Sequence, residues 1–546
     1  MECRIEEAIK TIKMNDRGGF TVPTNRLYPY QWNWDSGFTA LGIWHFNKWR
    51  AWLEIMALLD AQWEDGMVPH IVFRQNDPDY FPGPGVWQTN TEPASSGHSQ
   101  PPVLASMILR MVQNGTAYDM RKAREVFPRL MAYHRWFASA RDPQGTGVIG
   151  IIHPWESGRD NCPDWDIGMN AITVPGDLIA YKRRDTSHVD SDQRPTQEQY
   201  DRFITIVQFA RETGWDHRRI HAEGPFLMAD PGVQFIFLRA TRDLLTLAEM
   251  LDMTEAISEL RRLIEQVSKG SDWLWNDKVG GYCARDIRTG VFSDAITNAS
   301  MLCFYGDVGS PEQRASMAAH CRRILAACQF GMPSWDPEHA DFEPRRYWRG
   351  PVWAIMNHML ITGLADAGEE MLAQRIRSDT QKLIESQGMA EYFDPMDGTG
   401  LGGMDFSWTA AIYLDHRRDR VAREPPAPVG VEREPELEHL RRIVSPGPVL
   451  LLDRDEVTDA PVDRAADVLA RHPHEIVLDL GEVRAVTGLR YLARQDGGWN
   501  GAFGETELYL SSDPERFPDA PAATTTFVRD RKGQALNLPA PVQARY

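Results

Sequence analysis

Hydrophobic residues recur at helical spacing along most of the first 420 residues. Apolar positions three or four residues apart form one face of a helix, as in the run Ile257, Leu260, Ile264 and Val267. Capping boxes at residues 196–199 and 310–313 mark two helix starts. The pattern predicts about twelve helices, near residues 36–60, 100–114, 120–140, 168–183, 197–212, 233–251, 254–270, 293–305, 311–329, 350–366, 368–386 and 406–417. Twelve helices suggest six helix pairs.

The pattern changes after residue 420. The segment 421–438 holds four prolines among alternating charges, which disfavour both helix and sheet. We therefore expect a helical domain at residues 1–420, an acidic Pro-rich linker at 421–445 and a second domain at 446–546. Short apolar runs at residues 474–480 and 507–510, separated by turn residues, favour a β-sandwich in this second domain. Of the 18 tryptophans, only Trp499 follows the linker, so the two domains differ in composition.

Composition and charge restrict the function. Hydrophobic residues make up 42% of the chain and charged residues 25%, as in soluble globular proteins. The net charge of −18 disfavours binding to nucleic acid or to an anionic membrane. No apolar run reaches the ~18–20 residues of a membrane span, and the N-terminus lacks a basic-then-apolar signal. The sequence therefore predicts a soluble, cytoplasmic protein that binds a small molecule.

The six cysteines are scattered, without a CxxC pair or a metal-type spacing. This distribution indicates reduced thiols and predicts no structural metal. Signatures of serine hydrolases, zinc peptidases and P-loop enzymes are absent from the sequence. A GxGxxG match at 398–403 does not follow a hydrophobic strand, so it predicts a glycine-rich loop rather than a dinucleotide site. We expect no cofactor, and the sequence leaves the oligomeric state open.

Four loop clusters combine aromatic residues with carboxylates. They are YPYQWNWDSGF (28–38), HPWESGRDNCPDWD (153–166), RYWRGPVW (346–353) and EYFDPMDGTGLGGMDFSW (391–408). Sugar rings present C–H faces that stack on aromatic rings, and hydroxyl groups that pair with carboxylates. The clusters therefore favour a carbohydrate pocket, although any one of them is also compatible with buried tryptophans beside surface acids.

Glycoside hydrolysis needs a protonated carboxylic acid and a second, ionised carboxylate. Asp160 and Glu391 are the best candidates, because each lies in a Gly/Pro-rich loop beside aromatic residues, where partial desolvation favours a protonated acid. Other carboxyl groups in the same loops remain alternatives: Glu156, Asp164, Asp166 and Asp394. Each of these is equally compatible with capping a loop or helix start.

These motifs, in this order, resemble glycoside hydrolase family 63, and within it the bacterial mannosylglycerate and glucosylglycerate hydrolases. The likeness covers about residues 14–416 and extends to QWEDGMVPHIVF (62–73), SSGHSQPP (95–102) and RRDTSHVDSDQRPT (183–196). The resemblance implies an (α/α)6 barrel, in agreement with the six helix pairs, and cleavage of α-glycosides with inversion. His98 and Cys162 depart from the family pattern, which has an aliphatic residue and a serine there.

The resemblance also implies roles for individual residues. Asp160 would be the general acid, Glu391 the general base, and Asp35 a ligand of the sugar hydroxyls. The remaining substrate-binding residues would be Tyr28, Trp32, Tyr80, Gln100, Trp155, Gly158, Arg194, Tyr200, Tyr347, Trp348 and Trp353. Arg194 would bind the glycerate carboxylate, since a guanidinium binds a carboxylate through two parallel hydrogen bonds. The aromatic residues are also compatible with a core role, and Arg194 with a surface position beside a helix.

The C-terminal segment resembles discoidin or coagulation-factor type C modules, which are all-β galactose-binding-like sandwiches. The likeness covers about residues 450–546 and includes HEIVLDLGEVRAVTGLRYLARQDGGWNG, TELYLSSDPERF and PVQARY. In that family the last strand continues further, so this module is expected to be truncated. Modules of this type commonly bind carbohydrate, which makes a second glycan a candidate ligand.

The sequence thus predicts an inverting α-glycosidase that acts on glucosylglycerate or mannosylglycerate. One alternative is hydrolysis of a neutral α-glucoside such as trehalose or a kojibiose-type sugar, for which Arg194 would have no purpose. Another is a non-catalytic carbohydrate-binding protein, which would require one of the two carboxylates to point away from the pocket.

Overall fold

The computed structural model describes residues 4–25, 27–77, 79–183, 185, 189–418, 483–491, 505–513, 518, 520–528 and 534–545. The chain divides into two compact units, Met1–Val421 and Ala422–Tyr546. The predicted linker, the predicted strand at 474–480 and Trp499 lie outside the described residues. Among the residues described, no helix is both long enough and apolar enough to span a membrane.

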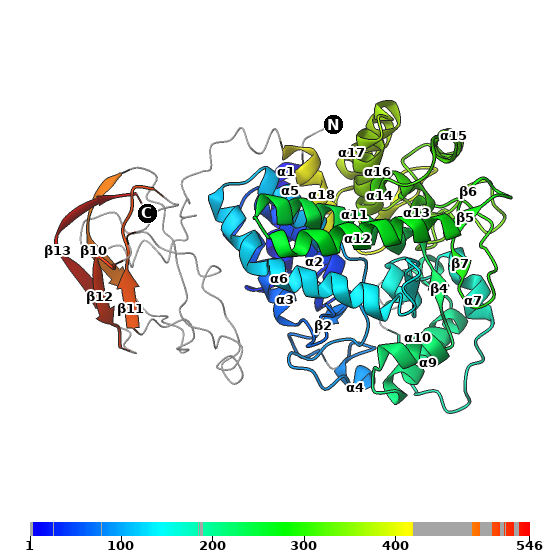
Figure 1. The fold of residues 1–546 in the computed structure, drawn as a ribbon, viewed down its shortest axis with the longest axis horizontal. Helices are drawn as coiled ribbons and strands as arrows, with labels where there is room; N and C mark the ends of the chain where they lie inside the picture. The colour runs from blue at the N-terminus through cyan, green and yellow to red at the C-terminus, as the bar shows by residue number, and fades with distance from the viewer. Residues whose placement is uncertain are drawn as a thin grey trace. The chain divides into compact units, whose positions relative to one another are not determined.

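The first unit is largely helical (Figure 1), and contacts between neighbouring helices join six of its described helices into a closed ring. In chain order these are α2 (Asn33–Trp44), α5 (Leu104–Gln113), α11 (Pro231–Met250), α14 (Cys303–Gly306), α16 (Ala354–Asp366) and α18 (Ser407–His416). Each contacts the next, and α18 contacts α2. Every residue of α2 is buried, as expected for a helix covered on all sides.

A second set of helices packs outside this ring. It comprises α1 (Ile5–Asn15), α3 (Lys48–Asp60), α6 (Ala117–Ala140), α12 (Thr254–Ser271), α15 (Pro311–Ala327) and α17 (Glu370–Gln387). Helix α12, for example, packs along α11 and buries only a narrow stripe that includes Leu260 and Val267. The predominantly helical character read from the apolar spacing is thus confirmed for the first unit.

The sequence located two capping boxes correctly, but it misplaced the limits of several helices. Capping boxes begin α9 (Gln197–Glu212) and α15, as the sequence predicts. The predicted helix 36–60 is two helices, because the chain turns after Trp44 and Asn47 caps α3. The predicted helix 168–183 is wrong beyond α7 (Asp166–Asn170), since Pro175 lies in the segment. Helices α1 and α10 (His217–Glu223) were not predicted.

Short strands fix the loops at the mouth of the ring. The antiparallel pairs are β1 (Gln31–Trp32) with β2 (Ile71–Val72), β5 (Trp275–Asn276) with β6 (Gly281–Tyr282), and β8 (Tyr392–Phe393) with β9 (Gly400–Leu401). A three-stranded sheet joins β3 (Gly150–Ile151), β4 (Met228–Ala229) and β7 (Arg285–Asp286). Short helices in the same loops are α4 (Pro84–Trp87), α13 (Asn298–Met301), η1 (Pro154–Ser157), η2 (Pro163–Trp165), η3 (Ser191–Gln193) and η4 (Asp272–Leu274).

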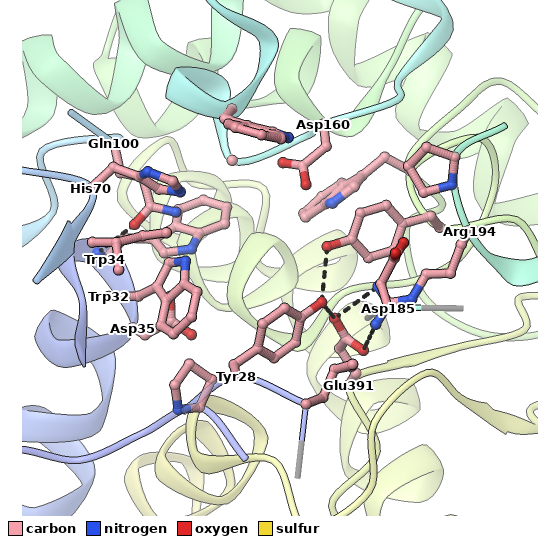
Figure 2. Close-up of a pocket in the computed structure, with 18 of the residues that line it drawn as sticks. Tyr28, Trp32, Trp34, Asp35, His70, Gln100, Asp160, Asp185, Arg194 and Glu391 are labelled. Atoms are coloured by element: carbon pink, nitrogen blue, oxygen red, sulfur yellow. Dashed lines mark hydrogen bonds and ion pairs between the residues drawn. The ribbon is translucent and has the colours of Figure 1, made fainter. Parts of the chain in front are cut away.

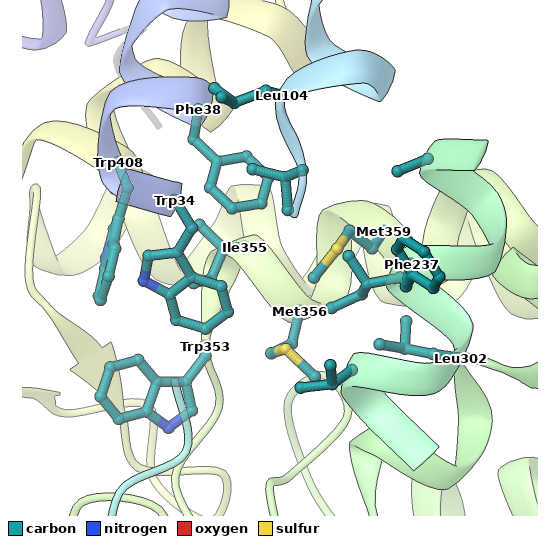
Figure 3. Close-up of a cluster of buried hydrophobic side chains, with 14 of the residues drawn as sticks. Trp34, Phe38, Leu104, Phe237, Leu302, Trp353, Ile355, Met356, Met359 and Trp408 are labelled. Atoms are coloured by element: carbon teal, nitrogen blue, oxygen red, sulfur yellow. The ribbon is translucent and has the colours of Figure 1, made fainter. Parts of the chain in front are cut away.

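The centre of the ring is filled with large apolar side chains (Figure 3). Trp34 and Phe38 of α2 meet Ile355, Met356 and Met359 of α16, with Leu104, Phe237 and Leu302 from the neighbouring ring helices and loops. Trp34 also packs edge-on against Trp408 of α18 at 6.0 Å. Trp34 and Trp408 thus lie at one end of the core, and both also line the pocket at the mouth of the ring.

In the second unit, the described residues form two antiparallel strand pairs. They are β10 (Arg484–Tyr491) with β13 (Gln534–Ala544), and β11 (Glu505–Leu508) with β12 (Ala523–Thr526). The predicted strand at 507–510 overlaps β11, and the PVQARY segment continues β13. The described residues of this unit are thus largely strands, as the short apolar runs between turn residues predict.

Candidate active site

A pocket at the mouth of the ring is lined by aromatic rings, four carboxyl groups and one guanidinium (Figure 2). Asp160 follows η1, Glu391 precedes β8, and Arg194 follows η3. Asp160 approaches the pocket from one side and Glu391 from the other (Figure 2). Two carboxyl groups that are 231 residues apart in the sequence are thus brought to one cavity.

Glu391 is fully buried and its carboxylate meets four donor contacts. The Tyr28 hydroxyl donates to Oε1 at 3.0 Å, and the Gly403 backbone N–H donates to Oε2 at 2.8 Å. The two terminal nitrogens of Arg194 face the same oxygens, at 3.5 Å from Oε1 and 3.3 Å from Oε2. These donors stabilise negative charge on Glu391.

A glycine allows this arrangement. Gly402 has φ +71°, in the left-handed region, and a Cβ there would lie 2.4 Å from Oε2 of Glu391. A side chain at this position would therefore push the carboxylate out of place. The glycine-rich loop expected at 398–403 therefore lies against the carboxylate of Glu391.

Arg194 is 1% exposed and lies between two tyrosine rings. Its guanidinium carbon is 4.6 Å from the centroid of the Tyr347 ring and 5.8 Å from that of Tyr28. Its Nε is buried and has no hydrogen-bond partner among the described residues. In this structure Arg194 is thus the ion-pair partner of Glu391, and one of its donors is unused.

Asp160 is only partly buried as a residue, and its carboxyl group lacks an adjacent ion-pair partner among the described residues. Burial of the carboxyl group raises the pKa of Asp160 to about 8. The charge of Arg194 opposes this rise, and the charge of Glu391 adds to it. Asp160 therefore carries its proton at neutral pH, as a general acid requires.

The loop of Asp160 is anchored by its neighbour Arg159. One terminal nitrogen of this buried guanidinium donates to both Asp164 and Asp230 at 2.8 Å. Asp230 also caps α11 through the backbone N–H groups of Gly232 and Val233. The candidate acid is thus connected to an inner helix of the ring by an ion-pair cluster. Asp164, an alternative acid in the sequence, belongs to this anchor.

Asp35 stands in the first turn of α2 and is 4% exposed. Burial raises the pKa of Asp35 well above its ordinary value, and the charges of Glu391 and Asp160 raise it further. Its backbone neighbour Trp34 donates to the side chain of Gln100 at 3.2 Å. Asp35 and Gln100 both line the pocket, where they offer polar groups to a ligand.

Most of the predicted binding residues line this one pocket. They are Tyr28, Trp32, Asp35, Tyr80, Gln100, Trp155, Gly158, Arg194, Tyr200, Tyr347 and Trp348. Gly158 lies there for a packing reason, because it has φ +70° and a Cβ would lie 2.4 Å from the Trp34 ring. The other alternative carboxylates, Glu156, Asp166 and Asp394, are not part of the lining.

Trp353 was predicted to bind substrate, but it lies behind the pocket wall and does not line the pocket. It is fully buried and stacks on Trp348 with ring centroids 3.7 Å apart and an interplanar angle of 3°. Its indole N–H donates to the carbonyl of Tyr347 at 3.3 Å. Trp353 therefore supports two lining residues, and its large side chain belongs to the core (Figure 3).

The two departures from the family motifs are both buried. His98 stacks between His70 and His153, with ring centroids 4.8 and 5.0 Å away. Burial lowers the pKa of His98 well below its ordinary value, so the ring is neutral. Cys162 accepts a hydrogen bond from Arg159 at 3.0 Å and so joins the anchor of the acid loop. Neither residue lines the pocket.

Sequence reasoning missed several lining residues. They include Trp34, His70, Phe81, Asp185, Phe203, Phe406 and Trp408. Five of the seven stand inside motifs that were already recognised: Trp34 in YPYQWNWDSGF, His70 in QWEDGMVPHIVF, Asp185 in RRDTSHVDSDQRPT, and Phe406 and Trp408 in the cluster at 391–408. The motif signal was thus present, and only the direction of each side chain was unknown.

Comparisons with known proteins agree with this geometry. Residues 28–409 match the family model of the mannosylglycerate hydrolase MGH1-like glycoside hydrolase domain, and residues 465–546 match the F5/8 type C domain. Mannosylglycerate hydrolase from Thermus thermophilus is 42% identical over 415 residues, covering 75% of this chain and 99% of that protein. Glucosylglycerate hydrolase from Mycolicibacterium hassiacum is 33% identical over 434 residues, covering 74% and 95%.

Solved structures give the same result. The crystal structure of GH63 mannosylglycerate hydrolase from Thermus thermophilus in complex with Tris and D-glycerate has a TM-score of 0.72 and 40% identity, and the match covers 75% of this chain and 98% of that one. The same enzyme in complex with glucose has a TM-score of 0.70 and 39% identity, with 75% and 99% covered. The chain therefore belongs to the mannosylglycerate hydrolase family within glycoside hydrolase family 63, and it is a glycoside hydrolase with a C-terminal F5/8 type C domain.

Proposed function

We propose that the chain hydrolyses an α-glycoside of glycerate, either mannosylglycerate or glucosylglycerate, with inversion at the anomeric carbon. The ring of inner helices and its outer layer would form an (α/α)6 barrel. The observation that carries the proposal is the buried guanidinium of Arg194 in a pocket that also holds Asp160 and Glu391. The relatives named for mannosylglycerate and glucosylglycerate, and the bound D-glycerate and glucose in the solved relative, support this choice.

In the proposed mechanism, Glu391 accepts a proton from a water molecule whose oxygen attacks the anomeric carbon. The bond from this carbon to the glycerate oxygen breaks, and Asp160 gives its proton to that oxygen. The raised pKa of Asp160 supplies the proton at neutral pH. Room for the water between the two carboxyl groups would require a separation of about 6.5–9.5 Å.

Around this pair, Asp35 and Gln100 would bind sugar hydroxyls, while Trp32, Tyr80 and Trp155 would stack on the ring. Tyr200, Tyr347 and Trp348 would enclose the glycerate, whose carboxylate would pair with Arg194. For the F5/8 type C domain we propose a second glycan as ligand, on the strength of its family match alone.

The test is a hydrolysis screen of mannosylglycerate, glucosylglycerate, trehalose and kojibiose with the purified full chain. The anomer released first is read by ¹H NMR before mutarotation. We expect rapid turnover of a glycerate glycoside with release of the β-hexose. Faster turnover of trehalose or kojibiose would reject the proposed substrate. Release of the α-hexose would reject the proposed inversion.

A further inference from the structure

Arg194 faces two competing demands. Among the described residues that line the pocket, it is the only cation, whereas Asp35, Asp160, Asp185 and Glu391 all bring carboxyl groups. His70 also lines the pocket, but burial lowers its pKa well below the ordinary value, so it adds no charge. A substrate carboxylate entering this pocket therefore has to use Arg194, which is already paired with Glu391.

Glu391, for its part, has no acceptor position to spare. A carboxylate offers about four lone-pair positions. Tyr28, Gly403 and the two terminal nitrogens of Arg194 direct four donors at its two oxygens. A water molecule that is to lose a proton to Glu391 must donate a hydrogen bond to one of these oxygens. At least one of the four donors must therefore move before catalysis.

The contacts of Arg194 are the ones suited to move. Its nitrogens lie 3.3 and 3.5 Å from Glu391, longer than the ~2.7–2.9 Å of a strong charge-assisted pair. The Gly403 N–H belongs to the backbone and contacts Oε2 at 2.8 Å. Arg194 also carries the buried, unpartnered Nε, which gives an incoming carboxylate a further donor.

We propose that the substrate's own carboxylate draws the Arg194 guanidinium away from Glu391 and thereby frees the general base for water. This inference rests on the proposed function and adds to it a cause of specificity: an anionic acceptor activates the base, and a neutral acceptor leaves it paired. Binding and activation then come from the same arginine.

Glycosyl fluorides separate this effect from substrate binding, because they leave the glycerate region of the pocket empty. Water attacks the anomeric carbon, Glu391 takes the proton, and the C–F bond breaks to release fluoride without a proton from Asp160. The full chain is assayed with α-mannosyl and α-glucosyl fluoride at constant ionic strength, with increasing D-glycerate, and with glycerol or acetate as controls.

We expect D-glycerate to raise kcat for the preferred fluoride about tenfold and to saturate, since that factor corresponds to one charge-assisted hydrogen bond. Glycerol should give no rise, and acetate at most a weak one. In Arg194→Gln the response to D-glycerate should disappear, with folding checked by circular dichroism and thermal melting. Activation of the wild-type chain alone already decides the matter if the variant does not fold.

Simple inhibition by D-glycerate, or an unchanged rate although calorimetry shows it bound, would overturn the inference. Absence of D-glycerate binding at any concentration would overturn it as well. Hydrolysis of mannosylglycerate and glucosylglycerate is measured on the same preparation. If either is hydrolysed while the fluoride assay shows no activation, only the inference that Arg194 moves from Glu391 to the substrate carboxylate fails. If neither is hydrolysed, the proposed function itself fails.

Discussion

Four close donor contacts surround the carboxylate of Glu391, whereas burial is the strongest influence on the carboxyl group of Asp160. Glu391 is the more deeply buried of the two, yet a guanidinium, a hydroxyl and a backbone N–H surround its carboxylate. At Asp160 the charge of Arg194, a backbone hydrogen bond and the Tyr347 hydroxyl also favour the ionised form, but burial outweighs them and raises its pKa to about 8. Two similar carboxyl groups in one pocket are thus suited to the opposite tasks that we propose for them.

The largest effect should come from exchanging each carboxyl group for its amide. Asp160→Asn should lower kcat/KM on a glycerate glycoside by about 10²–10⁴, the range of general acid catalysis, but should affect a glycosyl fluoride far less. Glu391→Gln should lose activity on both substrates, because both need an activated water. Steady-state kinetics on the two substrates checks this. Equal losses for Asp160→Asn on both substrates would remove the distinction between the two groups.

The next effect concerns the glycine behind Glu391. Gly402→Ala should cost about 10²-fold in kcat, because the new Cβ would lie 2.4 Å from Oε2 and displace the carboxylate. Gly403→Ala is the matched control, since it keeps the N–H donor and its Cβ would meet Thr24 at 3.3 Å. Measurement of kcat for both folded variants tests the point. Similar activity of the two would show that the position of Glu391 tolerates displacement.

A third, smaller effect concerns Arg194. Arg194→Ala should reduce kcat/KM on a glycerate glycoside roughly 10- to 150-fold, the size of one charge-assisted interaction. Neutral glycosides should be affected much less, and Arg194→Lys should recover part of the activity, because it keeps the charge and loses the planar fork. Comparison of charged and neutral substrates is the measurement. The same loss on both substrates would show that Arg194 supports the structure of its loop and does not bind the substrate carboxylate.

The smallest effect is expected from deleting the second unit. All pocket residues precede residue 421, so a chain of residues 1–420 should hydrolyse a soluble substrate within about twofold of the full chain. Turnover of both chains on the same glycerate glycoside provides the test. A large loss in a truncated chain that still melts cooperatively would mean that the second unit contributes to the pocket.

Much of the helical unit could be predicted, because apolar spacing and capping boxes are local signals. The boxes before α9 and α15 are examples. The limits of helices were less predictable where tertiary contacts or single residues end them, as at Asn47 between α2 and α3. The predicted helix 293–305 is instead two four-residue helices, α13 and α14, which span 298–306, and their break at Leu302 has no clear periodic signal.

At the site, the family resemblance carried by the motifs predicted which residues gather, but it could not give the directions of their side chains. Trp348 and Trp353 stand in one motif, yet one lines the pocket and the other stacks behind it. The pairing of Arg194 with Glu391 was equally hidden, because 197 residues separate them in the chain. Long-range packing decides both outcomes, and a single sequence does not report it.

The pH dependence of kcat/KM on a glycerate glycoside tests the assignment of Asp160 most directly. The acid is active with its proton, and burial holds its pKa near 8, so activity should persist through neutral pH and fall as the pH rises through about 8. With a glycosyl fluoride, which needs no proton on its leaving group, this alkaline decline should be absent. A decline that begins near pH 4, where an ordinary aspartate titrates, or an equal alkaline decline on both substrates, would contradict the role of Asp160 as the buried, protonated acid.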